Sequence, residues 1–204
     1  MNKLFKSIKK VVLPLFVLLN ISFLLAQDKD NKIHWGIKGG LNYSRLAAVY
    51  PLQDGLQGKD DIFFGGFATV KTSLPAVNSF LFEITYSGQG VYYEDMIENR
   101  YIHYNLPHLS IGYKARFKLH EHIFYQFGFS TDFLLRKNDI TSEFQNFDTT
   151  VSLFGFEFIF SKKISVFLDG KIGLRRSNIK NDIIPFERNV TNRVVRFGVC
   201  YYIK

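Results

Sequence analysis

The chain has 204 residues, with 26 Lys or Arg against 18 Asp or Glu and a formal net charge of +8 at pH 7. Residues 1–26 hold four of the basic side chains and none of the acidic ones, which leaves 22 basic against 18 acidic and a net charge of +4. This small excess forms no basic patch, which argues against binding of DNA or RNA, and the single cysteine, Cys200, excludes an intramolecular disulfide.

Residues 1–26 have the pattern of a secretory signal peptide. Four lysines among the first ten residues precede an apolar run from Val11 to Leu25, which ends at Ala26. The run is about fifteen residues long, whereas a membrane-spanning helix needs roughly twenty. We therefore predict cleavage after Ala26 and a single mature domain over residues 27–204, with an uncleaved N-terminal anchor as the alternative.

The mature chain alternates in polarity with the period of two that is typical of β-strands. Turn-forming clusters of Gly, Asn, Asp, Pro and Ser separate segments of roughly 10 to 15 residues, and aromatic residues make up 17% of the chain. In chain order, the eight predicted strands are Ile33–Ser44, Ile62–Lys71, Phe80–Tyr92, Tyr101–Lys118, Tyr125–Arg136, Val151–Phe160, Ile164–Arg175 and Arg193–Ile203.

Within these strands, apolar and polar side chains fall on opposite faces. In the third strand, Phe82 and Ile84 lie on the face opposite Glu83 and Thr85. The fourth strand changes parity near Pro107, which predicts a β-bulge there because proline cannot donate a hydrogen bond to the ladder.

The predicted connections alternate in length. The long or polar ones are Leu46–Asp60, Glu94–Asn99, Lys137–Asp148 and Ile179–Asn192. The shorter ones are Ser73–Ser79, Leu119–His122 and Ser161–Lys163. Brief turns on the periplasmic side and longer loops outside are typical of a membrane β-barrel.

Alternation alone does not tell which face points inward, so a soluble lipocalin-like barrel is an alternative. An eight-stranded barrel is only just wide enough for side chains to fill, and this chain has 22 Phe and 11 Tyr to place. Lipid accommodates such side chains on the outside, and closure of the barrel satisfies the backbone in hydrocarbon. We predict an all-β, single antiparallel up-and-down transmembrane β-barrel of about eight strands in the outer membrane of a Gram-negative bacterium.

The polar face then points into a narrow lumen, where unpaired charges are costly. We expect its acids and bases to interlock as ion pairs and hydrogen bonds and to plug the barrel. The predicted lumen charge network consists of Lys38, Glu83, Lys114, Arg116, Asp132, Arg136, Glu157, Asp169, Lys171, Arg175 and Arg196.

Tyr and Trp residues near the strand ends are typical of the aromatic girdles at membrane interfaces, although aromatic residues also favour strands in general. The girdle candidates are Trp35, Tyr43, Tyr92, Tyr93, Tyr101, Tyr125, Tyr201 and Tyr202.

The sequence offers two weak candidates for chemistry. The tripeptide from His120 to His122 has two imidazoles and a carboxylate, but alternate residues on a tight turn point apart and no further ligands follow at zinc-like spacing. The groups of a hydrolytic site are present in Ser87, Ser130, His108 and Asp132. No Gly-x-Ser-x-Gly elbow accompanies them. We therefore predict a noncatalytic protein without a metal or cofactor.

Three short motifs, in this order, resemble the PorT-type outer-membrane β-barrel family. They are Trp35–Ser44 (WGIKGGLNYS), Phe64–Phe67 (FGGF) and Tyr104–Leu109 (YNLPHL). The likeness extends over essentially the whole mature chain. It implies an eight-stranded outer-membrane barrel, a link in some relatives to protein export by the type IX route, and no catalytic residues. The chain departs from many such barrels by ending in Lys204 and not in an aromatic residue.

We expect a monomeric barrel that contacts outer-membrane lipid and has a structural or interaction role in the cell envelope. Other envelope or secretion proteins are its candidate partners. A small-solute transport or ligand-binding barrel is the first alternative and requires a continuous water path, for which eight strands leave little room. An envelope lipid-modifying enzyme is the second alternative.

Overall fold

The computed structural model describes residues 33–48, 56–95, 100–136, 147–174, 177–181 and 184–203. The predicted signal peptide, residues 1–26, lies outside them. None of the described residues belongs to a helix that is long and apolar enough to cross a membrane. The described strands are β1 (Ile33–Ala48), β2 (Leu56–Lys71), β3 (Ser79–Ser87), β4 (Gly90–Asp95), β5 (Arg100–Asn105), β6 (His108–His120), β7 (Ile123–Leu134), β8 (Phe147–Ile159), β9 (Ile164–Gly173), β10 (Ser177–Asn181) and β11 (Ile184–Tyr202).

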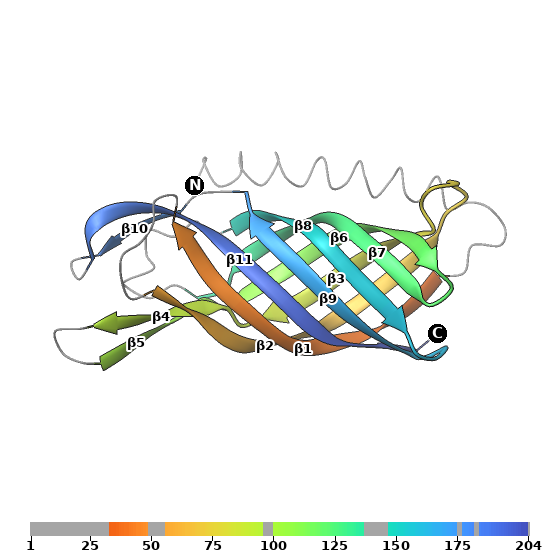
Figure 1. The fold of residues 1–204 in the computed structure, drawn as a ribbon, viewed down its shortest axis with the longest axis horizontal. Helices are drawn as coiled ribbons and strands as arrows, with labels where there is room; N and C mark the ends of the chain where they lie inside the picture. Colours follow the sequence, from red (N-terminus) through yellow and green to blue (C-terminus); the bar gives the residue numbers. More distant parts are fainter. Residues whose placement is uncertain are drawn as a thin grey trace.

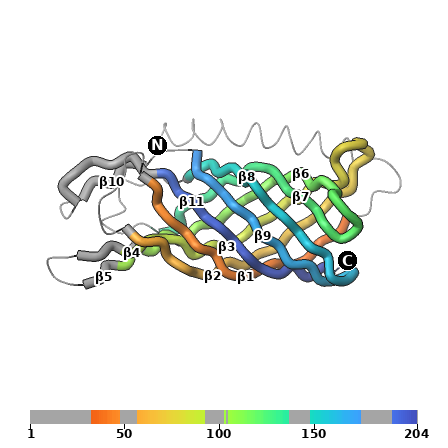
Figure 2. Tube along the Cα trace, viewed as in Figure 1, coloured from red at the N-terminus to blue at the C-terminus, as the bar shows by residue number. Residues whose placement is uncertain are grey.

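Eight of the described strands close into an antiparallel barrel (Figure 1). Around the wall the order is β1, β2, β3, β6, β7, β8, β9 and β11, and β11 pairs with β1 from Gly36 opposite Tyr202 to Ala48 opposite Val190. The wall strands run obliquely to the long axis of the molecule (Figure 2). Closure removes the open sheet edges and confirms the predicted fold class.

Three described strands lie outside the wall. β4 pairs with β5 and with the first residues of β2, and β10 pairs with the first part of β11. All three lie at the end of the barrel opposite the C terminus (Figure 1). The connections between β6 and β7 and between β8 and β9 lie at the other end and are short, as predicted. We call these two ends the loop end and the short-turn end.

Several predicted boundaries are wrong where strands extend past the wall. The third predicted strand is two strands, because the chain leaves the wall after Ser87 and resumes as β4 at Gly90, whose φ of 154° suits glycine. The fourth is interrupted at Leu106 and Pro107, where we expected only a bulge. Pro107 has no N–H for the ladder, and its carbonyl instead accepts a hydrogen bond from Leu135 N at 2.9 Å.

Two predicted loops also contain strand. β1 continues to Ala48 and β2 begins at Leu56, and β11 begins at Ile184 where we expected a loop. The polar composition of these stretches misled the prediction. Strand pairing itself needs no apolar face, so a ladder can continue where the alternation that marks a membrane strand ends.

One bulge among the described strands lies in β8. Gln126 pairs with Gly155 and Gly128 with Ser152, so Leu153 and Phe154 together oppose a single residue of β7. Both point outward, with 46% and 40% of their surface exposed. The extra residue resets the parity of the strand, so that side chains on both sides of the bulge point into the barrel.

The distribution of side chains is inverted relative to a soluble protein. Large apolar residues on the outside are widely exposed, for example Leu41 at 61% and Phe197 at 57%, whereas Glu83 and Asp169 on the inside are 1% exposed. An exposed apolar surface of this extent marks contact with a membrane. A closed antiparallel barrel with an apolar outer face is the architecture of outer-membrane proteins. This chain is therefore a protein of the outer membrane.

Candidate functional site in the barrel interior

Most of the predicted charge network lies in the barrel interior. Nine of its eleven members are at most 5% exposed: Lys38, Glu83, Lys114, Arg116, Asp132, Glu157, Asp169, Lys171 and Arg196. The prediction for Arg136 is wrong, because β7 ends at Leu134 and Arg136 lies exposed beyond the wall. Arg175 lies outside the described residues.

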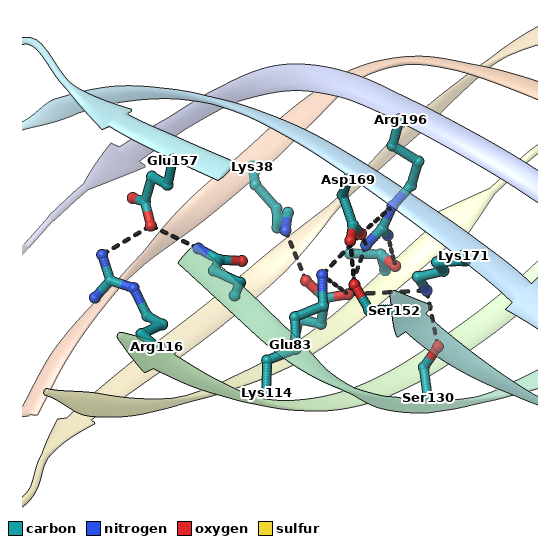
Figure 3. A network of polar contacts seen from close by, with 12 residues as sticks. Lys38, Glu83, Lys114, Arg116, Ser130, Ser152, Glu157, Asp169, Lys171 and Arg196 are labelled. Carbon is teal, nitrogen blue, oxygen red and sulfur yellow. Dashed lines mark hydrogen bonds and ion pairs between the residues drawn. The ribbon is translucent and has the colours of Figure 1, made fainter. Parts of the chain in front are cut away.

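Two carboxylates organise the middle of the lumen (Figure 3). Glu83 accepts hydrogen bonds from Lys38 Nζ at 2.6 Å and from Arg196 Nη2 at 2.8 Å. Asp169 accepts from Lys114 Nζ at 2.7 Å and from the Arg196 guanidinium. Arg196 therefore bridges the two acids, and the contacts join β1, β3, β6, β9 and β11 across the lumen. With Asp132 and Lys171, these residues form what we call the central cluster.

Lys171 is the least tightly paired cation of the central cluster. Its Nζ lies 3.9 Å from Glu83 Oε1 and 3.8 Å from Asp132 Oδ1, and it donates a hydrogen bond to Ser130 Oγ at 2.9 Å. The other three cations of the cluster each have a carboxylate oxygen within 2.8 Å. Four cations thus face three anions, and none of these side chains belongs to a residue more than 5% exposed.

A second group, the basal cluster, lies nearer the short-turn end. Glu157 accepts hydrogen bonds from Arg116 Nη2 and Gln126 Nε2, both at 2.7 Å, and from Ser165 Oγ and the Tyr202 hydroxyl, both at 2.6 Å. The four donors to this one carboxylate come from β6, β7, β9 and β11, and Arg116 supplies the positive charge that pairs with Glu157.

The interior placement of Tyr202 corrects its prediction as a girdle residue. Period two along β11 turns Tyr201 outward, 41% exposed, and Tyr202 inward. Trp35 and Tyr43 are exposed on the outer face at 47% and 45%, as a girdle requires, and Tyr125 donates from its hydroxyl to the Leu153 carbonyl at 2.9 Å. The side chains of Tyr93 and Tyr101 lie outside the described ones.

Aromatic rings pack against the buried cations, which the sequence did not predict. Lys38 Nζ lies 4.1 Å from the centroid of the Phe167 ring, and the Arg196 guanidinium carbon 5.3 Å from that of Phe63. Phe63 also packs with Phe67, Leu81, Phe167 and Cys200 in one buried group. We expected the polar face of each strand to line the lumen and predicted no ring there. β2 carries Phe on both of its faces, so its alternation does not reveal which ring points inward.

The backbone that leads into and out of the β4–β5 hairpin covers the loop end of the lumen. The Asn42 side-chain amide donates to Ser87 Oγ at 3.1 Å and to the Gly88 carbonyl, and Leu106 N donates to the Gln89 carbonyl at 2.7 Å. Gln89 is 2% exposed and Leu106 is 3% exposed. Side chains therefore fill the interior at the central cluster, and the segments beside the hairpin cover it on the side of the loop end.

The weak candidates for chemistry gain no support from their placement. Ser87, Ser130, His108 and Asp132 are at most 8% exposed, so an external substrate does not reach them in this conformation. The rings of His120 and His122 lie on the exposed β6–β7 turn with centroids 6.4 Å apart. Within the described part of the chain, no group of three or more His, Cys, Asp or Glu is arranged to hold a metal ion.

Comparison with known proteins finds no matching family model and no matching curated protein. Among solved structures, the outer membrane protein AlkL in lipid bilayers is similar with a TM-score of 0.46 and 10% identity, over 87% of this chain and 93% of that one. Neisserial surface protein A gives 0.42 and 11%, over 82% and 96%. Ail, the attachment invasion locus protein of Yersinia pestis, gives 0.40 and 11%, over 83% and 98%. These scores place the chain in no family, and its barrel assignment rests on its own strand pairing.

Proposed function

We propose that this protein is a noncatalytic outer-membrane barrel that acts as a structural or interaction element of the cell envelope. The closed interior supports this proposal most directly. Glu83, Lys114, Asp169 and Arg196 are each at most 1% exposed, which leaves no water path past them for a solute. The features available for interaction are on the outside of the barrel and at its loop end, where β4, β5 and β10 extend past the wall.

The closed interior predicts an absence of conduction. In planar lipid bilayers, the refolded protein should give no steady unit conductance. Arg136→Ala, which changes a side chain outside the lumen, should behave in the same way and serves as the matched control. Steady single-channel currents from the unmodified protein would contradict the closed lumen and favour the solute-transport alternative.

We further propose a role in protein export of the PorT kind. Two glycines of the WGIKGGLNYS motif support the resemblance to the PorT-type family. They have a physical role where β1 pairs with β11 and closes the barrel. At Gly36 and Gly40, an added Cβ would collide with the backbone of β11 at Tyr201 and Phe197, respectively. The motif is therefore suited to a first strand that closes tightly on the last one.

The export role is tested by deletion in the native bacterium. Loss of the gene should lower the amounts of type IX cargo proteins at the cell surface and in the medium, and expression of the unmodified gene should restore them. Total outer-membrane protein serves as the control for general envelope damage. An unchanged set of surface and secreted proteins would overturn the export role and leave the barrel assignment intact.

A further inference from the structure

Two arginines lie directly opposite each other on the outer face of the barrel. Arg45 of β1 and Arg193 of β11 are register partners across the seam that closes the barrel, and both are exposed. They point outward, because Tyr43 and Val195, two residues along the same strands, are 45% and 41% exposed. Directly opposed side chains on neighbouring strands have Cβ atoms about 5 Å apart, so two like charges here destabilise the pairing.

No acidic side chain among the described residues neutralises this pair. Neither arginine forms an ion pair within 4.0 Å in this part of the chain. The exposed acid nearest in register, Asp60, lies opposite Tyr43 and so is displaced by two positions from Arg45. By contrast, most of the cations in the lumen have a carboxylate oxygen within hydrogen-bonding distance. An opposed and unneutralised pair of guanidinium groups fits an external anion.

The height of the pair on the barrel identifies the source of that anion. The apolar outer face of β1 runs from Ile33 through Leu41 to Tyr43, and Arg45 is the next outward residue. Ten residues of a strand tilted by about 40° rise by about 25 Å, which equals the height of the apolar band of such barrels. The arginines therefore lie at the boundary between hydrocarbon and headgroups, at the loop end of the barrel. In this orientation the loop end faces the outer leaflet.

We propose that Arg45 and Arg193 bind the phosphate of an outer-leaflet lipid whose acyl chains lie on the apolar surface below them. Arginine is suited to this ligand because its planar guanidinium donates two parallel hydrogen bonds to phosphate oxygens. Bound phosphate removes the repulsion between the two arginines and so stabilises the seam between β1 and β11. The inference goes beyond the proposed envelope role and needs only that the barrel is inserted in a membrane.

The test uses the refolded mature barrel in nonionic detergent and two lipids with the same acyl chains. Dimyristoyl phosphatidic acid carries the phosphate, and dimyristoylglycerol lacks it. Native mass spectrometry gives the affinity of each lipid for the unmodified protein, for the variant with both Arg45→Gln and Arg193→Gln, and for the control Arg136→Gln. Arg136 is also an exposed arginine near the loop end, but it lies off the pair.

We expect the unmodified protein and Arg136→Gln to bind phosphatidic acid at least about tenfold more tightly than dimyristoylglycerol, and the double variant to lose this preference. Without lipid, the double variant should unfold at the same temperature as the unmodified protein or above it, because the like charges are gone. Phosphatidic acid should raise the unfolding temperature of the unmodified protein and of Arg136→Gln, but not that of the double variant. Heat-modifiable migration on a gel shows whether each variant has formed the barrel. A loss of lipid binding can therefore be told apart from a failure to fold.

Three results would overturn the proposal. The double variant could keep the full preference for phosphatidic acid, or dimyristoylglycerol could bind the unmodified protein equally well. Inorganic phosphate at the same concentration could also raise the unfolding temperature as much as the lipid does, which would make free phosphate the ligand.

Discussion

At the scale of single residues, Glu83 is the side chain on which the interior depends most. Lys38 and Arg196 donate to it directly, and the ammonium groups of Lys114 and Lys171 lie within 3.9 Å. Glu83 is 1% exposed, so water cannot replace it as a partner for these cations. Breaking a buried pair by removal of one partner is far more costly than the net contribution of the pair, because the other charge is left uncompensated.

Glu83→Gln is therefore expected to destabilise the barrel. The amide keeps the size of the side chain but removes the charge, and the free energy of unfolding should fall by about 3–5 kcal/mol. Urea titration of the protein refolded in lipid vesicles measures this loss. Glu121→Gln, on the exposed β6–β7 turn, is the matched control and should leave the unfolding free energy unchanged. A loss below about 1 kcal/mol for Glu83→Gln would show that the central cluster does not hold the wall strands together.

At the scale of the elements, the bulge in β8 decides which side chains enter the lumen. Ser152 on one side of Leu153 and Glu157 on the other both point inward and are 1% exposed. Their separation of five residues is odd, which a regular strand would place on opposite faces. With one extra residue at Leu153, both keep their partners, Asp169 for Ser152 and Arg116 for Glu157.

Deletions on and off the bulge should therefore differ sharply. Deletion of Leu153 leaves Ser152 inward, Phe154 outward and Glu157 inward, so we expect a folded barrel. Deletion of Ala115 in β6, which pairs with β3 without a register shift, puts Lys114 and Arg116 on opposite faces. One of the two charges then faces lipid, where it costs several kcal/mol, so we expect no folded barrel. The fraction of protein that shows heat-modifiable migration after refolding measures both outcomes. Equal refolding of the two deletions would contradict the assigned register.

The alternation of polarity in the sequence predicted the strands of the wall but not the segments beyond it. Period two identified the wall strands because each of them has one face in lipid, and this constraint also placed Glu83 and Asp169 inside. It failed where that constraint is absent. The extensions that begin at Leu56 and Ile184 are paired although polar residues predominate in their sequences. Arg136 follows β7, whose sequence alternation continues past the end of the strand at Leu134. The inward Phe63 and Phe167 were missed because rings occupy both faces of the wall.

At the scale of the whole molecule, the barrel has a charged interior and an apolar exterior, and each depends on the other. The interior side chains come from strands far apart in the chain, so the central cluster forms only once the wall has closed. Arg196 and Glu83, for example, are 113 residues apart in sequence. Sequence alternation could place these charges inside, but their partners follow from the registers between strands, which alternation does not fix.

The asymmetry of the two ends predicts the orientation of the barrel in the membrane. Cys200 is 3% exposed and points inward, so a single introduced cysteine reports its own position. Arg136→Cys lies at the loop end, and Ser73→Cys lies in the connection at the short-turn end; both sites are exposed.

Because long loops of such barrels face outward and short turns face the periplasm, a membrane-impermeant maleimide should label Arg136→Cys in intact cells. It should label Ser73→Cys only after the outer membrane is permeabilised. The unmodified protein should be labelled only after unfolding, which is the control for Cys200. Labelling of Ser73→Cys alone in intact cells would reverse the orientation and would place Arg45 and Arg193 in the inner leaflet.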